Sequence, residues 1–494
     1  MLAWQTTLSL SRRLAATVRR TSARLLSADV EPRMPPCDFE PLPFEGMPRD
    51  KVKAVRSTNL SPAVFSYYKE PLYAYQGHKQ WLFDSEGKRY LDLFAGIVTV
   101  GVGHCHPKVV QATKRQIDKL WHTTNIYWHS TLHEYAERLV ALLPEDLNVV
   151  YMCNSGSEAN DLAMLMARLH TGAFDIISLR NAYHGMSPYT MGVTALGNWT
   201  HQLPNGFGCH QTVNPDVYRG PWGGSKCRES ICQVADRICS CSPGECVASD
   251  KYVEQLDDMM KHSMPKKIAG FMAEYIQGVG GTVHLPKGFL PDAYELVRQR
   301  GGVCIADEVQ TGFGRVGTHF WGFQQAGVKP DIVVLAKSIA NGFPMGAVVT
   351  NATIAKSLTG ALHFNTYGGN PIGCAAAIAV LDVIEEEKLQ ERCRTVGDYF
   401  MRKLLELRDE YAVIGDVRGT GLMLGMEMVD DQETRKPMAP QRVNALWDDT
   451  KDLGILVGKG GLYGSTFRIK PPMCITEEDV DFAIAVFRKA LNRL

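Results

Sequence analysis

The stretch LNVVYMCNSGSEANDLAMLMARLH, residues 147–170, joins a strand pattern directly to a helix pattern. Its first eight residues are mostly apolar and include two valines, which is typical of a strand buried in a parallel sheet. In the second half, the residues at i, i+3, i+4 and i+7 are apolar: Leu162, Leu165, Met166 and Leu169. This spacing predicts a helix with one apolar face, and a buried strand followed at once by a helix predicts an α/β fold.

The connection between this strand and this helix has the features of a phosphate-binding turn. Ser155 and Glu158 have the S-x-x-E spacing of a capping box, so the helix is expected to begin here. Gly156 and Ser157 would then leave backbone N–H groups at the positive end of the helix, where a phosphate binds. Taken alone, an ordinary capped helix explains this motif equally well.

Similar apolar runs recur between about residues 103 and 350, and helical stretches separate them. They are FDIISL (174–179), KIAGFMAEY (267–275), GVCIADEV (302–309) and PDIVVLAK (330–337). Strands that alternate with helices predict a mainly parallel sheet with ligands at the carboxyl ends of the strands.

The two ends of the chain have a different pattern. Residues 79–96 alternate as a hairpin with its turn at Ser85 to Gly87, and residues 368–389 read as one long helix. The later runs VRGTGLMLGMEMV (417–429) and STFRIKPPMCIT (465–476) predict a smaller α+β domain. We therefore expect an N-terminal segment, 31–102, that packs with a small domain, 386–494, and a large domain, 103–385.

Residues 1–30 have the composition of a mitochondrial transit peptide. Five arginines precede the first acidic residue, Asp29, and they are Arg12, Arg13, Arg19, Arg20 and Arg24. A secretory signal fits less well because these charges follow the apolar MLAWQTTLSL instead of preceding it, and a disordered tail is the remaining alternative. We expect the protein in the mitochondrial matrix.

Composition argues against several classes of protein. The 53 Lys and Arg balance the 53 Asp and Glu, so nothing indicates a nucleic-acid partner. The longest uncharged apolar stretch, around residues 93–106, is too short and too rich in Gly and His to span a membrane.

The cysteines and histidines raise the question of a metal. Of thirteen cysteines, five crowd one window: Cys227, Cys232, Cys239, Cys241 and Cys246. A zinc clip is possible in principle, but the spacing lacks paired C-x-x-C units and favours reduced thiols in a surface insertion. For His104 and His106 a structural role in the loop is favoured over metal ligation. We expect no metal site.

An acid and an amine end two successive strand patterns. Asp307 closes GVCIAD, and Lys337 closes PDIVVLAK thirty residues later, one strand-crossover-strand unit away. A solvated strand end is the alternative for Lys337 alone. Together with the phosphate turn, however, these groups match pyridoxal phosphate, which needs a lysine for its Schiff base, a carboxylate at its ring nitrogen and an anion cradle.

A second cofactor motif competes with this interpretation. In ADEVQTGFGRVG (306–317), Gly312, Gly314 and Gly317 have the G-x-G-x-x-G spacing of a dinucleotide-binding turn. That motif requires a helix directly after the glycines, but THFWGFQQAG (318–327) has no apolar helical face. A nicotinamide-dependent dehydrogenase is therefore disfavoured.

Five motifs, in order and spacing, resemble the class-III aminotransferases. They are NSGSEAN (154–160), AYHG (182–185), ADEVQTGFGRVG (306–317), LAKSIANGFPMGAV (335–348) and NTYGGNP (365–371). The resemblance covers all but about the first thirty residues. It implies a fold type I pyridoxal-phosphate transferase, with a large domain around a mainly parallel sheet and a smaller α+β domain.

The resemblance also implies roles for single residues. Lys337 corresponds to the Schiff-base lysine and catalytic base, Asp307 to the partner of the pyridinium nitrogen, and Arg468 to the guanidinium that binds the substrate carboxylate. Thr366 resembles a threonine that reaches the phosphate of a neighbouring subunit, which implies a homo-oligomer, a dimer or tetramer, with its active site at the dimer interface. The other implied cofactor-binding residues are Gly156, Ser157, Tyr183, His184, Glu274 and Gln310.

The reaction implied is transfer of the amino group of L-alanine, and of β-amino acids such as 3-aminoisobutyrate, to glyoxylate or pyruvate. This chain reads EYIQGV where many relatives read EPIQGE, so Tyr275 and Val279 depart from the pattern. A glutamate in place of Val279 would pair with Arg468, and valine cannot do so. An aminotransferase for another amine, an aminomutase and a phospho-lyase remain alternatives within the same fold.

Overall fold

The computed structural model describes residues 31–204, 206–223, 241 and 246–494. The predicted transit peptide, residues 1–30, lies outside the described residues. So do three members of the cysteine window, Cys227, Cys232 and Cys239.

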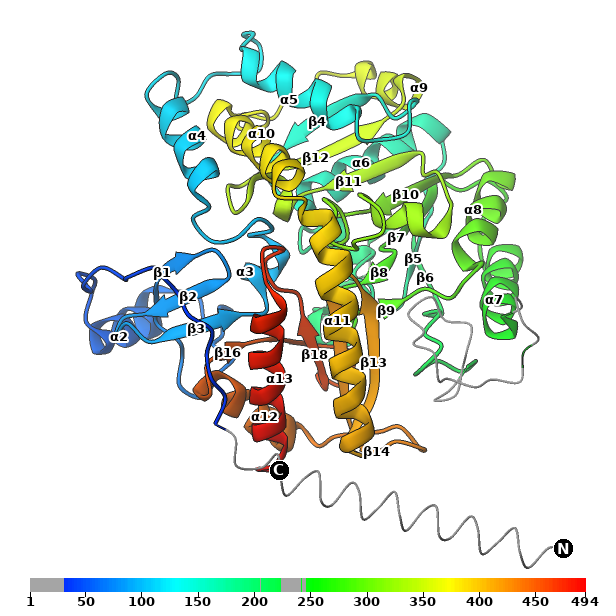
Figure 1. Cartoon of the computed structure of the whole chain (residues 1–494). Coiled ribbons are helices and arrows are strands. Elements are labelled where there is room, and N and C mark those ends of the chain that lie inside the picture. Colours follow the sequence, from blue (N-terminus) through cyan, green and yellow to red (C-terminus); the bar gives the residue numbers. More distant parts are fainter. Residues whose placement is uncertain (1–30, 205, 224–240, 242–245) are drawn as a thin grey trace, which may run out of the picture.

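Seven strands build the central sheet of the molecule. They are β4 (Val149–Cys153), β5 (Ile176–Leu179), β6 (Cys209–Thr212), β7 (Gly270–Ala273), β10 (Val303–Asp307), β11 (Ile332–Leu335) and β12 (Gly346–Thr350). Their order is β4-β12-β11-β10-β7-β5-β6 (Figure 1). Neighbours pair in parallel except at β12, which is antiparallel to both β4 and β11. The mainly parallel sheet predicted from the sequence is confirmed.

Helices cover both faces of this sheet, which explains why its strands are continuous apolar runs. In β11, Ile332 and Val334 pack in one buried cluster with the apolar face of α6 (Gly156–Thr171). Val333 and Leu335 point to the opposite face and pack with α10 (Pro371–Glu386). Two further helices lie on that second face, α7 (Val247–Ser263) and α8 (Phe289–Gln299).

The central sheet and its helices form the first unit of the molecule, and a second unit contains two smaller sheets. One joins β1 (Ala74–His78), β2 (Trp81–Asp84), β3 (Arg89–Asp92) and β16 (Ile455–Leu456), and the other joins β13 (Ile414–Thr420), β14 (Met423–Asp431), β15 (Lys436–Pro437), β17 (Gly458–Gly460) and β18 (Thr466–Ile469). Strands β2 and β3 form the predicted hairpin. Parallel pairing of β3 with β16 attaches the N-terminal segment to the C-terminal part of the chain. A separate short pair links β8 (Ile276–Gln277) to β9 (Val283–His284).

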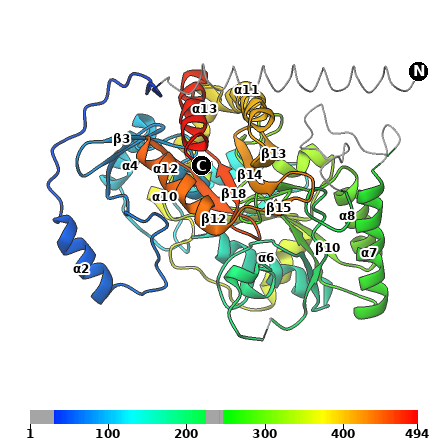
Figure 2. The same cartoon turned by 90° about the horizontal axis from the view of Figure 1, so that it is seen from below.

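The remaining helices lie around these sheets. They are α2 (Arg49–Asn59), α3 (Ala95–Val98), α4 (Pro107–Ile117), α5 (Ser130–Val140), α9 (Ala352–Ala355), α11 (Leu389–Glu410), α12 (Pro440–Asp452) and α13 (Glu477–Leu491). Figure 2 shows α2 at the periphery, and none of its residues is buried. The prediction of one helix over 368–389 was wrong at its end, because α10 stops at Glu386 and Lys388 turns the chain with a φ of 50° before α11 begins.

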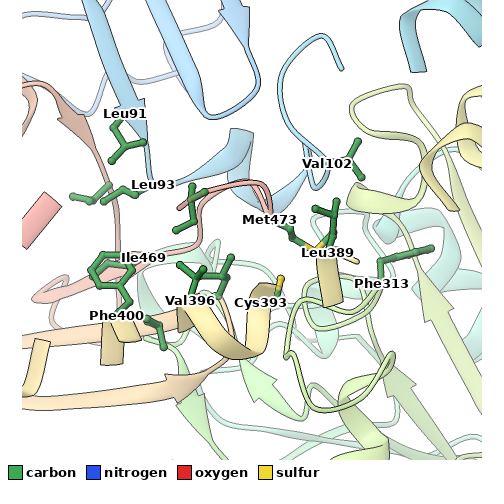
Figure 3. Close-up of a cluster of buried hydrophobic side chains, with 14 of the residues drawn as sticks. Leu91, Leu93, Val102, Phe313, Leu389, Cys393, Val396, Phe400, Ile469 and Met473 are labelled. Carbon is green, nitrogen blue, oxygen red and sulfur yellow. The ribbon is translucent and has the colours of Figure 1, made fainter. Parts of the chain in front are cut away.

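One buried cluster holds the two units together (Figure 3). It combines side chains of the hairpin, of α11 and of the chain around β18 with Phe313 from the loop after β10. The residues labelled in the figure are Leu91, Leu93, Val102, Phe313, Leu389, Cys393, Val396, Phe400, Ile469 and Met473. The relative position of the units is therefore fixed by apolar packing.

The glycine loop of residues 312–317 belongs to this junction. Gly317 has a φ of 79°, and a Cβ there would lie 2.6 Å from the backbone nitrogen of Arg394 in α11. The chain continues into a short 3-10 helix, η3 (Gly322–Ala326), and no α-helix follows the glycines directly. The spacing thus serves a close packing contact, and the helix that a dinucleotide turn requires does not follow it.

Two histidines of the loop before α4 contact carboxylates. His104 Nε2 lies 2.7 Å from Asp92 Oδ2, and His106 Nε2 lies 2.9 Å from Glu387 Oε1. Within the described residues, no three His, Cys, Asp or Glu side chains are grouped so that they could hold a metal ion. In the same part of the chain, no helix has the length and apolarity needed to cross a membrane.

Asp307 ends β10 and Glu308 follows it, and the two carboxylates have different surroundings. Asp307 faces the cavity described below, whereas Glu308 is 1% exposed and points into the protein. Its carboxylate accepts hydrogen bonds from Gly322 N (2.7 Å), Phe323 N (2.8 Å) and Thr311 Oγ1 (2.7 Å). Glu308 therefore anchors the start of η3.

We expect Glu308→Ala to lower the free energy of unfolding by about 3 kcal/mol, because it leaves three buried donors without their acceptor. Urea unfolding followed by circular dichroism measures the change. Removal of the exposed Glu433 by Glu433→Ala serves as the control and should cost less than about 0.5 kcal/mol. Equal stability of the two variants would contradict a structural role for Glu308.

Candidate active site

A cavity of about 280 Å³ lies at the carboxyl ends of β4, β10 and β11. The sites predicted at three separate strand ends meet there: Gly156 and Ser157 after β4, Asp307 at the end of β10, and Lys337 after β11. Parallel strands bring their carboxyl ends to the same edge of a sheet, which is where α/β proteins place ligands. Tyr183, His184, Glu274 and Gln310, also predicted as site residues, line the same cavity.

The first turn of α6 forms one end of the cavity. Gly156 is the first helical residue, and the first backbone N–H groups of a helix have no acceptor within it. Gly185 lies so close that a Cβ on it would be 2.5 Å from Ser157 Oγ. Ser157 Oγ accepts a hydrogen bond from Met186 N at 3.3 Å, which fixes this turn against the 183–186 segment. The positive end of α6 is therefore available to an anion.

The predicted capping box is only half formed. Ser155 Oγ accepts from Glu158 N at 3.2 Å, so the helix begins where predicted. Glu158 does not return the contact: its Oε2 accepts instead from Asn154 N at 2.9 Å and from Asn365 Nδ2 at 3.2 Å. Prediction of the reciprocal bond was wrong because Glu158 ties the strand end to the loop before α10.

Asp307 is held by three donors at the base of the cavity. Its Oδ2 lies 2.7 Å from His184 Nδ1 and 2.9 Å from Asn160 Nδ2, and its Oδ1 accepts from Val309 N at 3.1 Å. Asn160 Nδ2 also donates to His184 O at 2.8 Å, so the three side chains form one connected group. This network fixes the direction of the Asp307 carboxylate. His184 lines the cavity and orients the Asp307 carboxylate by this contact.

Lys337 stands beside this carboxylate with a strained backbone. It begins the short helix η4 (Lys337–Ala340) with a φ of 51°, a conformation that is uncommon for a residue with a side chain. Burial lowers the pKa of its amine to about 8, although Glu274 acts in the opposite direction. A substantial fraction of the amine is therefore neutral near pH 7.5, which is the form that accepts a proton.

Glu274 and Gln310 line the cavity on its third side. Glu274 Oε1 accepts from Gly278 N at 3.0 Å and lies 3.5 Å from Gln310 Nε2. Burial, together with the nearby charge of Asp307, raises the pKa of Glu274. The half-buried Tyr183 lies edge-on to Trp199, with ring centroids 5.3 Å apart.

Arg468, on β18 of the second unit, is 3% exposed and is not among the residues that line the cavity. It adjoins the cavity through Gln310, with Nη2 3.5 Å from Gln310 Oε1. Phe467 and Ile469, on either side of Arg468 in the strand, lie in the apolar core, so Arg468 points to the opposite face. Burial lowers the pKa of Arg468 to about 10, which leaves it charged at neutral pH. In the described part of the chain it forms no ion pair with a carboxylate.

Val279 and Thr366 lie at the margins of this arrangement. Val279 lines a neighbouring pocket with Tyr67 and Trp199. Thr366 is exposed on the loop before α10 and is not among the residues that line the cavity of the single chain.

Two polar residues of the site were missed from the sequence. Asn160 stands in the middle of an apolar helix face, and only the tertiary contact with Asp307 shows its role. Lys470 is fully buried, with Nζ 3.2 Å from Gln310 Oε1. Period-2 alternation along the strand places Lys470 on the same face as Arg468, which the resemblance had identified, so a signal for Lys470 was present.

Several buried polar atoms around the cavity have no partner in the described chain. They are His184 Nε2, Asn160 Oδ1, Glu274 Oε2 and Arg468 Nε. Because buried polar atoms are nearly always satisfied, these atoms indicate a polar ligand. Pyridoxal phosphate fits the donor set: a helix N-terminus for its phosphate, a carboxylate for its ring nitrogen and an amine for its aldehyde.

Comparisons with known proteins agree with this site. A family profile described as class-III aminotransferase matches residues 66–491. The human protein named "Alanine--glyoxylate aminotransferase 2, mitochondrial" is 56% identical over 481 residues, which cover 97% of this chain and 93% of that protein.

Solved structures are similar over most of the chain. An (S)-enantioselective omega-transaminase from Thermomicrobium roseum has a TM-score of 0.80 at 30% identity and covers 90% of this chain and 98% of its own. A phospholyase from Arthrobacter, in complex with phosphoethanolamine, has a TM-score of 0.79 at 28% identity and covers 90% of this chain and 100% of its own. The resemblance found in the motifs is therefore confirmed, and the chain belongs to the class-III aminotransferases.

Proposed function

We propose that this protein is a pyridoxal-phosphate transaminase that moves the amino group of L-alanine to glyoxylate or pyruvate. The observation that carries the proposal is the meeting of Lys337, Asp307 and the N-terminus of α6 in one cavity. The name of the human relative, at 56% identity, supports the choice of alanine and glyoxylate.

Six of the residues that line the cavity would hold the cofactor. Gly156 and Ser157 would bind the phosphate through backbone N–H groups, and Asp307 would keep a proton on the ring nitrogen. Tyr183 would cover the ring, and Gln310 would contact its 3-oxygen. Glu274 would border the ring through its unpartnered Oε2. Bound pyridoxal phosphate supplies an acceptor for the electron pair that is left when the substrate loses its Cα proton.

The proton transfer belongs to Lys337. Its neutral amine takes the Cα proton of the substrate and later returns a proton, and a pKa of about 8 suits both directions near neutral pH. Asp307 cannot serve as this base because His184, Asn160 and Val309 hold its oxygens by hydrogen bonds. Its role is to keep a negative charge in a fixed position.

Arg468 would select the substrate by its carboxylate. A guanidinium binds a carboxylate through two parallel hydrogen bonds, and no side-chain carboxylate of the described residues occupies Arg468. Val279 cannot form such a pair, so Arg468 is available to α-amino acids. The same contact leaves room for β-amino acids such as 3-aminoisobutyrate.

An oligomer is part of the proposal. Exposed apolar side chains gather on two segments that contact each other through Asn370 Nδ2 and Trp121 O: Trp121, Ile126, Tyr127, Trp128, Leu362, Phe364 and Tyr367. A patch of this kind is typical of a subunit interface, and the exposed Thr366 lies within it. We propose a homo-oligomer, a dimer or tetramer, in which Thr366 completes the phosphate site of the neighbouring subunit.

The remaining proposals concern the ends of the chain. We assign residues 1–30 to a transit peptide and the mature protein to the mitochondrial matrix, which the name of the human relative supports. We divide the rest into an N-terminal segment (31–102), a large cofactor domain (103–385) and a small domain (386–494). The β3–β16 pairing and the end of α10 at Glu386 support these boundaries.

Lys337→Ala tests the assignment directly. Turnover of alanine and glyoxylate should fall by at least about 10³-fold, because the variant has no amine to move the proton. The purified wild type should change its absorption spectrum when L-alanine is added, and the variant should not. Lys267→Ala, which removes an exposed lysine, should leave turnover unchanged. Near-normal transamination by Lys337→Ala would refute the proposal.

The pKa of Lys337 gives a second prediction. In protein freed of cofactor, the rate at which an amine-selective acylating reagent labels Lys337 should rise with pH and reach half its maximum near pH 8, because only the neutral amine reacts. Exposed lysines should reach half their maximum near about 10.4. Peptide mass spectrometry over a pH series measures both, and a midpoint shared by Lys337 and the exposed lysines would contradict the predicted environment.

Arg468→Ala tests the substrate assignment. The KM values of alanine and glyoxylate should rise by about 10- to 100-fold as the charge-assisted contact is lost, with a smaller effect on a monoamine. Val279→Glu should weaken the use of α-amino acids selectively, because the new carboxylate would compete for Arg468. If Arg468→Ala leaves both acids unaffected, the carboxylate is bound elsewhere.

A further inference from the structure

Lys470 is a buried lysine that has no role in the proposed mechanism. It follows β18 directly, its backbone N donates to Leu93 O at 2.7 Å, and its side chain is fully buried. Within the described residues no carboxylate lies within ion-pair distance of its amine. Burial and the neighbouring charge of Arg468 lower the pKa of Lys470 well below its usual value. A lysine in this position costs free energy, so stability does not explain it.

The polar contact of Lys470 in the described chain is with Gln310. Lys470 Nζ lies 3.2 Å and Arg468 Nη2 lies 3.5 Å from the same oxygen, Gln310 Oε1. The Arg468 guanidinium only donates hydrogen bonds, so the atom that faces it must be the amide oxygen, and the Lys470 amine can donate to the same oxygen whether it is charged or neutral. The oxygen and the nitrogen of a side-chain amide are nearly the same size, so the hydrogen-bond partners of Gln310 determine which atom occupies which position.

The orientation of Gln310 has a consequence for the cavity. Because Arg468 and Lys470 hold Oε1, Nε2 faces Glu274 Oε1 at 3.5 Å. Gln310 therefore presents N–H groups, and no acceptor, to a ligand in the cavity. A negatively charged ligand oxygen is favoured by this arrangement, and the reversed amide would repel it.

We propose that Lys470 is a positioning residue that locks the amide of Gln310 so that its Nε2 faces the cofactor. This inference rests on the proposed function, in which Gln310 contacts an oxygen of pyridoxal phosphate. Arg468 shares the contact at a longer distance but is committed to the substrate carboxylate, so the lock depends on Lys470.

A double-mutant cycle on the full-length protein with pyridoxal phosphate tests the proposal. Lys470→Met should weaken cofactor affinity about tenfold, because the amide is free to reverse. Gln310→Met should have an effect of similar size. In the Gln310→Met background, Lys470→Met should add less than about twofold, since the residue through which it acts is gone. Fluorescence titration with pyridoxal phosphate measures all four affinities.

A spectroscopic signature distinguishes this role from a structural one. In Lys470→Met the amide of Gln310 no longer holds its N–H donor toward the negatively charged ligand oxygen, which favours the protonated form of the bound cofactor, so the pH midpoint of its visible absorption should move upward. Lys451→Met is the matched control: it removes another buried lysine, bonded to Glu70 O outside the site, and should change neither affinity nor midpoint. If the methionine variant does not fold, the same cycle is run with Lys470→Gln.

The outcomes separate the two proposals. If wild type binds pyridoxal phosphate and Lys470→Met binds it equally well, or weakens it equally in both backgrounds, the positioning role is overturned while the proposed function stands. If wild type shows no cofactor absorption at all, the proposed function itself fails.

Discussion

Parallel pairing of β10 with β11 is the constraint on which the site depends. Their register places Asp307 opposite Val334, so Asp307 and Lys337 emerge from neighbouring strands at the same edge of the sheet. The antiparallel β12 lies between β11 and β4, which ends at the predicted phosphate turn. It starts with Gly346, where a side chain would not fit because an added Cβ would lie 2.6 Å from Ser155 O. Because the chain returns so tightly after Lys337, the amine and the helix N-terminus share one cavity. The strained φ of Lys337 is the local cost of that turn.

A second layer of contacts sets the chemical state of these groups. Asn160 comes from α6, His184 from the segment after β5, and both converge on Asp307. The helix that offers its N-terminus to a phosphate thus also holds the carboxylate at the opposite end of the cavity. The apolar packing of α6 against β11 and β12 keeps the two ends at a fixed separation. A rigid cofactor with an anionic group at one end and a basic nitrogen at the other matches such a frame.

The sequence predicted the parts of the site that follow from local pattern. Strand ends and helix starts depend on neighbours along the chain, so the positions of Asp307, Lys337 and Gly156 could be predicted, whereas the role of Arg468 was implied by the family resemblance. The role of Glu308 was missed, because only tertiary packing shows that it anchors the start of η3. The insertion of β12 was missed for the same reason: a short apolar run gives no sign of its pairing partners. The break at Lys388 was hidden by a helical pattern that continues through it.

The balance of charge around Gln310 explains why the site is suited to anionic ligands. Arg468 and Lys470 are buried basic groups and Lys337 is a half-buried one. Desolvation lowers the pKa of all three, and Arg468, with a pKa of about 10, stays charged at neutral pH. Asp307 and Glu274 bring two acids, and burial raises the pKa of Glu274 toward its neutral form. The surplus of positive charge lies on the Arg468 side, away from the His184 network. A substrate carboxylate at Arg468 would offset that surplus, while a neutral amine would leave it in place. The preference for amino acids over simple amines that we propose would thus rest on these charges as well as on the single contact with Arg468.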